Sequence, residues 1–190
     1  MYLEKSPITP YPMQLGIISD IHDHLWNLDA ALLALEDCDA LLCAGDLCAP
    51  FVMAALGRGF AKDIHIVFGN NDADLFRITR IAQQIGPRVH LHGELAQLEL
   101  GGKPIAMNHF DYIARDLAAS GRYKLVVFGH NHRKEETMLP GRGGRSVTLL
   151  NPGPIMGVAF KDGQPERVPT SFARYDTDTG EISWGQVVEE

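Results

Sequence analysis

The feature that most constrains the fold of this sequence is a repeated alternation of short apolar runs with stretches of helical spacing. Five apolar runs, several of them rich in β-branched residues, are typical of buried strands: residues 14–19, 40–43, 64–68, 104–107 and 124–128. Between them, four stretches place apolar residues at helical spacing: residues 25–36, 51–56, 75–85 and 112–120. Strands that alternate with helices of this length need right-handed crossovers, so we expect an at least partly parallel sheet.

The last third of the chain changes to hairpin-like material. Strand character returns in residues 135–139, 146–150, 171–175 and 181–188, and no helix is evident after Lys134. We expect residues 141–145 and 161–170 to be mobile loops. Residues 1–13, which contain three prolines, are expected to form an extended lead-in. The remaining residues, 14–190, fit one α/β domain whose mixed sheets share a core.

Composition excludes several classes of protein. The chain is 45% hydrophobic and 22% charged, which is typical of a globular protein. No segment approaches the roughly 18 to 20 apolar residues of a membrane-spanning helix, and the first residues lack the apolar region of a signal peptide. The three cysteines, Cys38, Cys43 and Cys48, show no CxxC spacing, which favours a reducing cytoplasm over a disulfide framework. A net charge of -7 disfavours a surface that coats nucleic acid.

Metal-ligating residue types follow the predicted strands, at the point where each strand ends. The motifs are Asp20-Ile21-His22, Gly45-Asp46, Gly69-Asn70-Asn71-Asp72, Asn108-His109 and Gly129-His130-Asn131-His132. In open α/β sheets, ligands gather at the carboxyl ends of the strands, so we expect these loops to converge on one edge. Imidazole, carboxylate and amide ligands suit Mn, Fe, Zn, Co or Ni better than Mg or Ca. A cluster of this size can hold two ions about 3.5 to 4 Å apart, bridged by one carboxylate.

This ordered set of motifs, followed by Asn151-Pro152-Gly153, resembles the calcineurin-like metallophosphoesterases, and within them the small prokaryotic YfcE-like phosphodiesterases. The resemblance covers residues 14–158. It implies the metallo-dependent phosphatase fold, a four-layer α/β/β/α sandwich with two mixed sheets. It also implies the ligand set: Asp20, His22 and His132 for one ion, Asn70, His109 and His130 for the other, and Asp46 as the bridge. We expect two divalent transition-metal ions, manganese first, with iron, zinc, nickel or cobalt as alternatives.

The function implied by the resemblance is hydrolysis of small phosphodiesters by a metal-bridging hydroxide. The residues expected to carry catalysis are Asp46, Asn70 and His22, and those expected to contact substrate are Asn70, Asn71, Asp23 and His24. An equal alternative is that Asp23 and His24 hold His22 in its orientation without touching the substrate. The chain departs from the family at Asn71, where many members have His. Since an amide cannot act as a general acid, we expect slow hydrolysis of poor leaving groups.

Other residues and other functions offer alternatives to this interpretation. His65, His90 and His92 lack partners at ligand spacing, and we expect them to be surface or core histidines. Phe110 follows His109 where the family commonly has Gly, and we expect it to narrow the pocket. The alternative function is a catalytically weak metal-binding scaffold of the VPS29 type, found in retromer. A DNA exonuclease is disfavoured because the chain has no basic tract. The resemblance also implies a homodimer or homotetramer.

Overall fold

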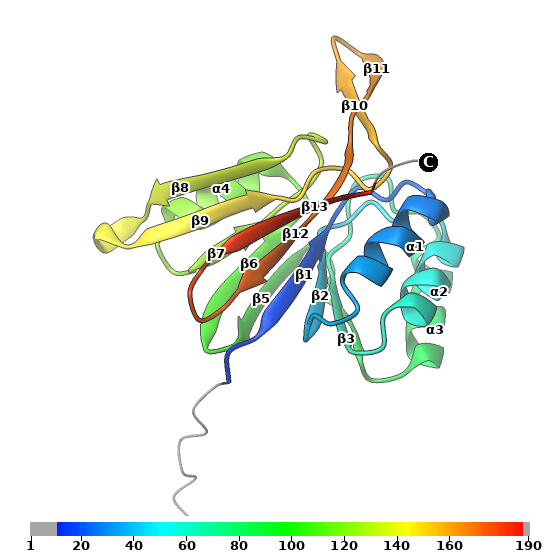
Figure 1. Ribbon diagram of the computed structural model, residues 1–190, viewed down its shortest axis with the longest axis horizontal. Helices are drawn as coiled ribbons and strands as arrows, with labels where there is room; N and C mark the ends of the chain where they lie inside the picture. Colours follow the sequence, from blue (N-terminus) through cyan, green and yellow to red (C-terminus); the bar gives the residue numbers. More distant parts are fainter. Residues whose placement is uncertain (1–10, 188–190) are drawn as a thin grey trace, which may run out of the picture.

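The computed structural model describes residues 11–187 and is built around two facing sheets (Figure 1). The first sheet has the strand order β13-β12-β1-β2-β3-β4. Its strands are β1 (Gln14–Ile18), β2 (Ala40–Cys43), β3 (Asp63–Ile66), β4 (Val89–Leu91), β12 (Thr170–Asp176) and β13 (Ile182–Val187). Strands β1 to β4 are parallel to one another, whereas β12 and β13 are antiparallel to their neighbours.

The second sheet is also mixed and has the order β5-β6-β7-β9-β8. Its strands are β5 (Leu95–Leu100), β6 (Lys103–Asn108), β7 (Leu125–Val127), β8 (Glu135–Pro140) and β9 (Ser146–Asn151). Parallel pairing joins β6, β7 and β9, and antiparallel pairing adds β5 and β8 at the edges. A separate hairpin consists of β10 (Val158–Lys161) and β11 (Gln164–Arg167).

Helices cover the outer face of each sheet, which completes four layers. Helices α1 (Leu25–Ala34), α2 (Pro50–Gly59) and α3 (Leu75–Ile85) lie on the first sheet, and α4 (Asp111–Ala119) lies on the second (Figure 1). Alternate side chains of β1 serve two layers, because Leu15 and Ile17 pack between the sheets while Ile18 packs under the helices. The predicted four-layer α/β/β/α fold with two mixed sheets is confirmed. No helix within residues 11–187 is long and apolar enough to cross a membrane.

The structure corrects some predicted elements. The four predicted helices exist within a few residues of their expected bounds, but β4, β5 and the β10–β11 hairpin were not predicted. The predicted loop over residues 161–170 was wrong in part, because Gln164–Arg167 forms β11. All four residues of β11 are exposed, so the strand has no apolar alternation and is defined by its pairing with β10. A 3-10 turn, Arg142–Gly144, lies inside the other predicted loop.

The predicted lead-in falls mostly outside the described residues. Residues 1–10 lie outside them, as do residues 188–190, which include the end of the last predicted strand. Residues 11–13 have no regular structure, and β1 begins at Gln14 as expected.

Candidate metal centre

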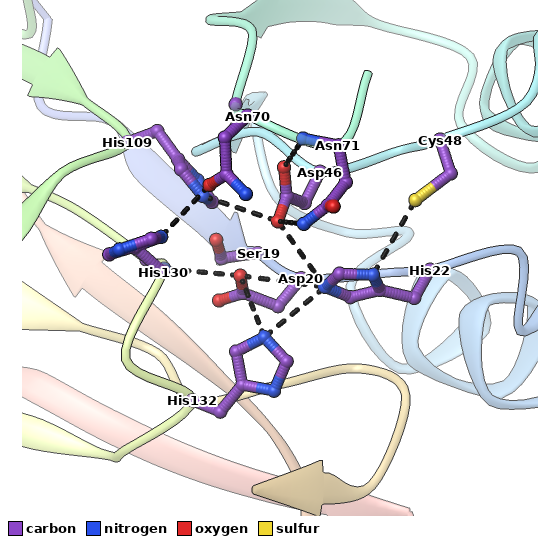
Figure 2. Close-up of polar contacts among 12 residues, drawn as sticks. Ser19, Asp20, His22, Asp46, Cys48, Asn70, Asn71, His109, His130 and His132 are labelled. Carbon is purple, nitrogen blue, oxygen red and sulfur yellow. Dashed lines mark hydrogen bonds and ion pairs between the residues drawn. The ribbon is translucent and has the colours of Figure 1, made fainter. Parts of the chain in front are cut away.

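Side chains from five loops that follow strand ends converge on one site (Figure 2). The loops follow β1, β2, β3, β6 and β7, and they carry the seven predicted ligands: Asp20, His22, Asp46, Asn70, His109, His130 and His132. The convergence follows from topology, because the carboxyl ends of parallel strands meet at the same edge of each sheet. The loops are also tied to one another, since the amides of Ile21 and His22 both donate to the carbonyl of Asp46, at 3.0 Å each.

Several residues of the site have positive φ, a backbone conformation that residues other than glycine rarely adopt. Nine non-glycine residues of the described chain have positive φ, and five of them are predicted ligands. These are Asp20 (φ 53°), His22 (43°), Asp46 (55°), His130 (70°) and His132 (55°). Each such residue costs on the order of 1 to 3 kcal/mol, and strain of this kind concentrates at functional sites. The loops therefore aim these side chains at a common point at the expense of stability.

The first group of ligands forms a compact cluster. Asp20, His22, Asp46 and His132 each offer one ligand atom, and these atoms all lie within 4.8 Å of one another. His22 Nε2 is 3.2 Å from His132 Nε2 and 3.3 Å from Asp46 Oδ2. His132 Nε2 is 3.4 Å from Asp20 Oδ1. Two imidazole nitrogens and two carboxylates thus face the same small volume.

The second group lies on the other side of Asp46. His109 Nε2 is 3.3 Å from Asp46 Oδ2, the same oxygen that His22 approaches. His130 Nδ1 is 2.9 Å from Asn70 Oδ1, and its ring centroid lies 5.2 Å from that of His109. Asp46 therefore lies between the two groups, in the place that a bridging carboxylate needs.

Backbone carbonyls fix the orientation of two of the histidines. His109 Nδ1 lies 2.7 Å from the carbonyl of Ala44, and His132 Nδ1 lies 2.7 Å from the carbonyl of Val158. Because a carbonyl only accepts, each Nδ1 carries a proton that it donates. In the neutral ring, Nε2 then has a free lone pair directed into the site. Histidines that bind metals in proteins are commonly held in this way.

The donor set fits a metal ion. Within the described chain, Asp20 Oδ2 and His109 Nε2 are buried side-chain atoms without a hydrogen-bond partner. Leaving such a group unpaired costs about 1 to 3 kcal/mol, and more if it is charged. A cation among the lone pairs of imidazoles and carboxylates would satisfy both atoms, and this mixture of nitrogen and oxygen donors suits first-row transition metals.

Comparison with known proteins agrees with this geometry. The family model described as the calcineurin-like phosphoesterase superfamily domain matches residues 13–180. The chain belongs to the calcineurin-like phosphoesterase superfamily. The predicted superfamily is thereby confirmed, and with it the prediction of a hydrolase of phosphoric esters at the level of the family.

Individual relatives are more distant. The phosphodiesterase MJ0936 of Methanocaldococcus jannaschii is 26% identical over 151 residues, which cover 76% of this chain and 86% of the relative. The solved structure of an archaeal phosphodiesterase matches with a TM-score of 0.78 at 22% identity, covering 92% of this chain and 100% of that one. Vacuolar protein sorting 29 from Cryptosporidium parvum matches with a TM-score of 0.62 at 19% identity, covering 93% and 97%. These two structural matches show a shared fold.

Burial and neighbouring groups shift the pKa values of the site residues in opposite directions. Burial raises the pKa of Asp46, but His109, 3.3 Å away, and the two hydrogen bonds from Asn71 outweigh burial and hold that pKa well below its usual range. Burial raises the pKa of Asp20, although His109 and His132 partly offset the effect. Burial lowers the pKa of His109, but the neighbouring carboxylates of Asp46 and Asp20 raise it by more, so the net shift is upward. Asp46 is therefore ionised at neutral pH, as a ligand must be.

The predicted substrate contacts are partly engaged within the protein. Asp23 Oδ1 accepts a hydrogen bond of 2.9 Å from the amide of Ala49. Asn71 donates to Asp46 twice, from its backbone N to Oδ1 and from Nδ2 to Oδ2, each at 2.9 Å (Figure 2). His24 caps α1, and its ring lies 5.9 Å from that of Trp26. Asn71 thus holds the central carboxylate in place, and Asp23 holds the start of α2.

Three residues that were not among the predicted site residues contact the loops or the side chains of the site. Asp72 accepts from the amides of Gly69 (2.7 Å), Cys48 (2.9 Å) and Asp46 (3.1 Å), so it ties the loops after β2 and β3 together. Cys48 Sγ lies 3.5 Å from His22 Nδ1. Asn151 Nδ2 donates to the carbonyl of Gly129 and to Asn131 Oδ1, both at 2.9 Å. Asp72 and Asn151 stand within the motifs, so the motifs themselves were the available signal.

Phe110 lies beside the second group of ligands. Its ring centroid is 5.0 Å from that of His130 and 5.4 Å from that of His109. The exposed ring of Tyr112 follows at 5.7 Å from Phe110. An aromatic edge therefore borders the site next to His130.

Proposed function

We propose that this protein is a metal-dependent phosphodiesterase that hydrolyses small phosphodiesters at a dinuclear centre. The observation that carries the proposal is the place of Asp46, whose Oδ2 lies 3.3 Å from both His22 Nε2 and His109 Nε2. One carboxylate oxygen thus faces both groups of ligands. Two ions about 3.5 to 4 Å apart, bridged by a carboxylate, are typical of phosphoesterase chemistry.

The residues divide between two metal positions. Asp20, His22 and His132 would hold one ion, Asn70, His109 and His130 the other, and Asp46 both. Bound divalent ions neutralise phosphoryl oxygens and lower the pKa of water, which makes hydroxide available near neutral pH. We propose manganese as the native metal, with iron, zinc, nickel or cobalt as alternatives. The mixture of imidazole and oxygen donors supports this group of metals over magnesium and calcium.

The side chains then have distinct tasks. Asp46 remains ionised because His109 and Asn71 hold its pKa low. Asn70 lies beside His130, where its amide Nδ2 can donate to a phosphoryl oxygen while Oδ1 faces the second position. His22, with Cys48 Sγ 3.5 Å from its Nδ1, directs its Nε2 toward Asp46 and His132.

Departure of the leaving group is the demanding step for this chain. The amide of Asn71 cannot donate a proton as a general acid, and it is already hydrogen-bonded to Asp46. Diesters with weakly basic leaving groups, such as nitrophenolate, need no such proton. We therefore infer that aryl diesters are cleaved much faster than alkyl diesters.

The test is metal analysis combined with hydrolysis of bis(4-nitrophenyl) phosphate. The protein is stripped with a strong chelator, dialysed and titrated with Mn²⁺. We expect two ions per chain, loss of hydrolysis after stripping and recovery with metal. Binding of two ions without turnover of any diester would favour the scaffold alternative, of the kind that the fold likeness to vacuolar protein sorting 29 suggests. Failure to retain or rebind metal would overturn the dinuclear centre.

The proposal extends to the oligomeric state and the cellular location of the protein. We infer a homodimer or homotetramer from the resemblance to the family. We infer a cytoplasmic location because the three cysteines show no CxxC spacing. Light scattering of the purified protein measures the first, and fractionation of the source cells measures the second.

A further inference from the structure

The β10–β11 hairpin stands out from the end of the molecule at which the ligand loops converge (Figure 1). Its base is joined to the metal centre, because the carbonyl of Val158 accepts from Nδ1 of His132 at 2.7 Å. The ring of Phe160 on β10 lies 5.6 Å from the ring of His132, at an interplanar angle of 59°. The hairpin therefore contacts one of the predicted ligands from outside the site.

A hollow of about 400 Å³ lies against this hairpin and includes His132 in its wall. This volume is within the range of about 300 to 1,000 Å³ that small-molecule sites occupy. Phe160 lines the hollow and is 53% exposed, so its ring is open to a ligand. The hollow thus lies next to the proposed reaction centre and offers an aromatic face.

The hollow is cationic in an acidic protein. Its charged lining residues are Arg133, Lys134, Lys161 and Glu166, which is three cations against one acid, or a net +2, where the whole chain carries -7. Lys134 is held in place, since its Nζ lies 4.0 Å from the centroid of the Trp184 ring. A ligand for this hollow is expected to combine a flat ring, which stacks on Phe160, with a negative charge.

We propose that this hollow binds one organic arm of the diester, and that the arm is a nucleoside bearing a further phosphate. The inference rests on the proposed function and names its substrate class. A nucleobase supplies the ring that stacks on Phe160, and the additional phosphate lies near Arg133 and Lys161. The reacting phosphate remains at the metal centre beside His132, where water adds to phosphorus and the other ester oxygen departs.

The test uses three diesters that share 4-nitrophenolate as leaving group. Their retained arms are ethyl, thymidine (a 5′-ester) and thymidine carrying a 3′-phosphate. Because the departing group is the same, differences in kcat/KM report the retained arm. We expect thymidine to exceed ethyl by about tenfold, as stacking of one base on an aromatic ring allows. The 3′-phosphate should add about two- to fivefold, as exposed ion pairs allow.

Matched variants separate stacking from charge. Phe160→Ala should reduce the thymidine-to-ethyl ratio to near one, and Lys161→Gln should reduce only the gain from the 3′-phosphate. Each ratio compares two substrates of the same variant. Any general loss of activity that Phe160→Ala causes by disturbing His132 therefore cancels. The controls are Phe76→Ala, an exposed aromatic on α3, and Lys124→Gln, an exposed lysine at the opposite end of β7 from the ligands. Neither control should change the ratios.

A binding measurement complements the rates. Thymidine 3′,5′-bisphosphate is titrated into metal-loaded protein by calorimetry, and Phe160→Ala should weaken binding by about tenfold. Hydrolysis of the ethyl ester with equal rates for all three arms would overturn this inference and leave the phosphodiesterase proposal intact. Loss of the preference in Phe76→Ala as strongly as in Phe160→Ala would also overturn it. No hydrolysis of any of the three by metal-loaded protein would overturn the proposed function instead.

Discussion

Two groups of histidines in this molecule have similar composition and different geometry. One is the candidate metal centre, with His22, His109, His130 and His132. The other lies on and beside β3 and β4 and contains His65, His90 and His92. In that group the rings stack, with His65 and His90 centroids 4.5 Å apart at an interplanar angle of 13°. His65 Nδ1 lies 3.1 Å from His92 Nε2, and His90 Nε2 lies 3.5 Å from Asp63 Oδ1.

The difference shows what a metal centre needs besides imidazoles. Rings in the candidate centre are tilted, at 56° between His22 and His132 and 70° between His109 and His130, so their nitrogens can converge. Nearly parallel rings point their lone pairs side by side. The centre also has two buried carboxylates, Asp20 and Asp46, and left-handed loops that aim its side chains. In the β3–β4 group, His65 and His90 lie on regular strands, where successive side chains follow the pleat, and His92 follows the end of β4.

The largest expected effect contrasts the two groups directly. Asp46→Ala removes the carboxylate between the two sets of ligands, and we expect diester hydrolysis to fall by about 10³-fold or more, because several kcal/mol of metal-dependent stabilisation are lost. His65→Ala should leave kcat/KM within about twofold. Steady-state rates and metal content of both variants check this. Equal, few-fold losses would mean that the site is assigned to the wrong residues.

A second prediction adds a histidine to the candidate centre. Asn71→His supplies a group that can donate a proton to the departing oxygen, an effect that reaches about 10² to 10⁴-fold for general acids. The substitution also removes the Nδ2 bond to Asp46, so rates with good leaving groups should fall. We expect the ratio of alkyl to aryl diester hydrolysis to rise by about 10²-fold at most.

The measurement is a leaving-group series on both proteins at saturating metal. The native chain should show a steep dependence of rate on leaving-group pKa, and Asn71→His a flatter one. Parallel dependences would show that another group already acts as the acid, and His24, which lies in the same hollow as His22, would be the next residue to test.

The smallest expected effect is on stability in acid, and it concerns His65 of the β3–β4 histidines. Burial, with His90 and His92 nearby, lowers the pKa of His65 to about 4. A histidine in the unfolded chain has a pKa of about 6.5. Because the folded pKa is the lower one, the stability contribution of neutral His65 is fully present above about pH 6.5 and is lost as the pH falls toward 4.

Denaturant unfolding at two pH values measures this effect. Between pH of about 7 and about 5, His65 should account for about 2 kcal/mol of lost unfolding free energy, and His65→Gln should lose that much less. The chelated protein is used for both, so that metal release at the other site does not contribute. An identical pH dependence in the two proteins would show that His65 is already protonated in the folded state.

The helical part of the fold could be predicted because its pattern is local. Leu75–Ile85 was expected from its apolar spacing and is α3 with the same bounds. The strand Leu95–Leu100 was missed although apolar and polar residues alternate from Ala96 to Leu100, a signal that was available. The hairpin strand Gln164–Arg167 offered no such signal, since its side chains are all exposed.

The ligand set was accessible to sequence reasoning for a related reason. Each ligand follows a strand end within a short motif, and parallel topology alone brings strand ends to one edge. Motifs such as Gly45-Asp46 and Asn108-His109 therefore indicated that a site exists and what its donors are. The motifs alone did not indicate which donors face which, because that depends on loop dihedral angles, and the division into two sets rested on the resemblance to the family.

The sequence by itself determined the order of the helices and of most strands, the residue types at the strand ends and the family. Only the tertiary structure decided that Asn71 holds Asp46, that Asp72 joins two loops, and that Phe160 from a distant hairpin lies against His132. The physical reason is the range of the interactions. Periodicity and turn chemistry act over a few neighbouring residues, whereas the contacts that decide these points join residues 24 to 28 positions apart.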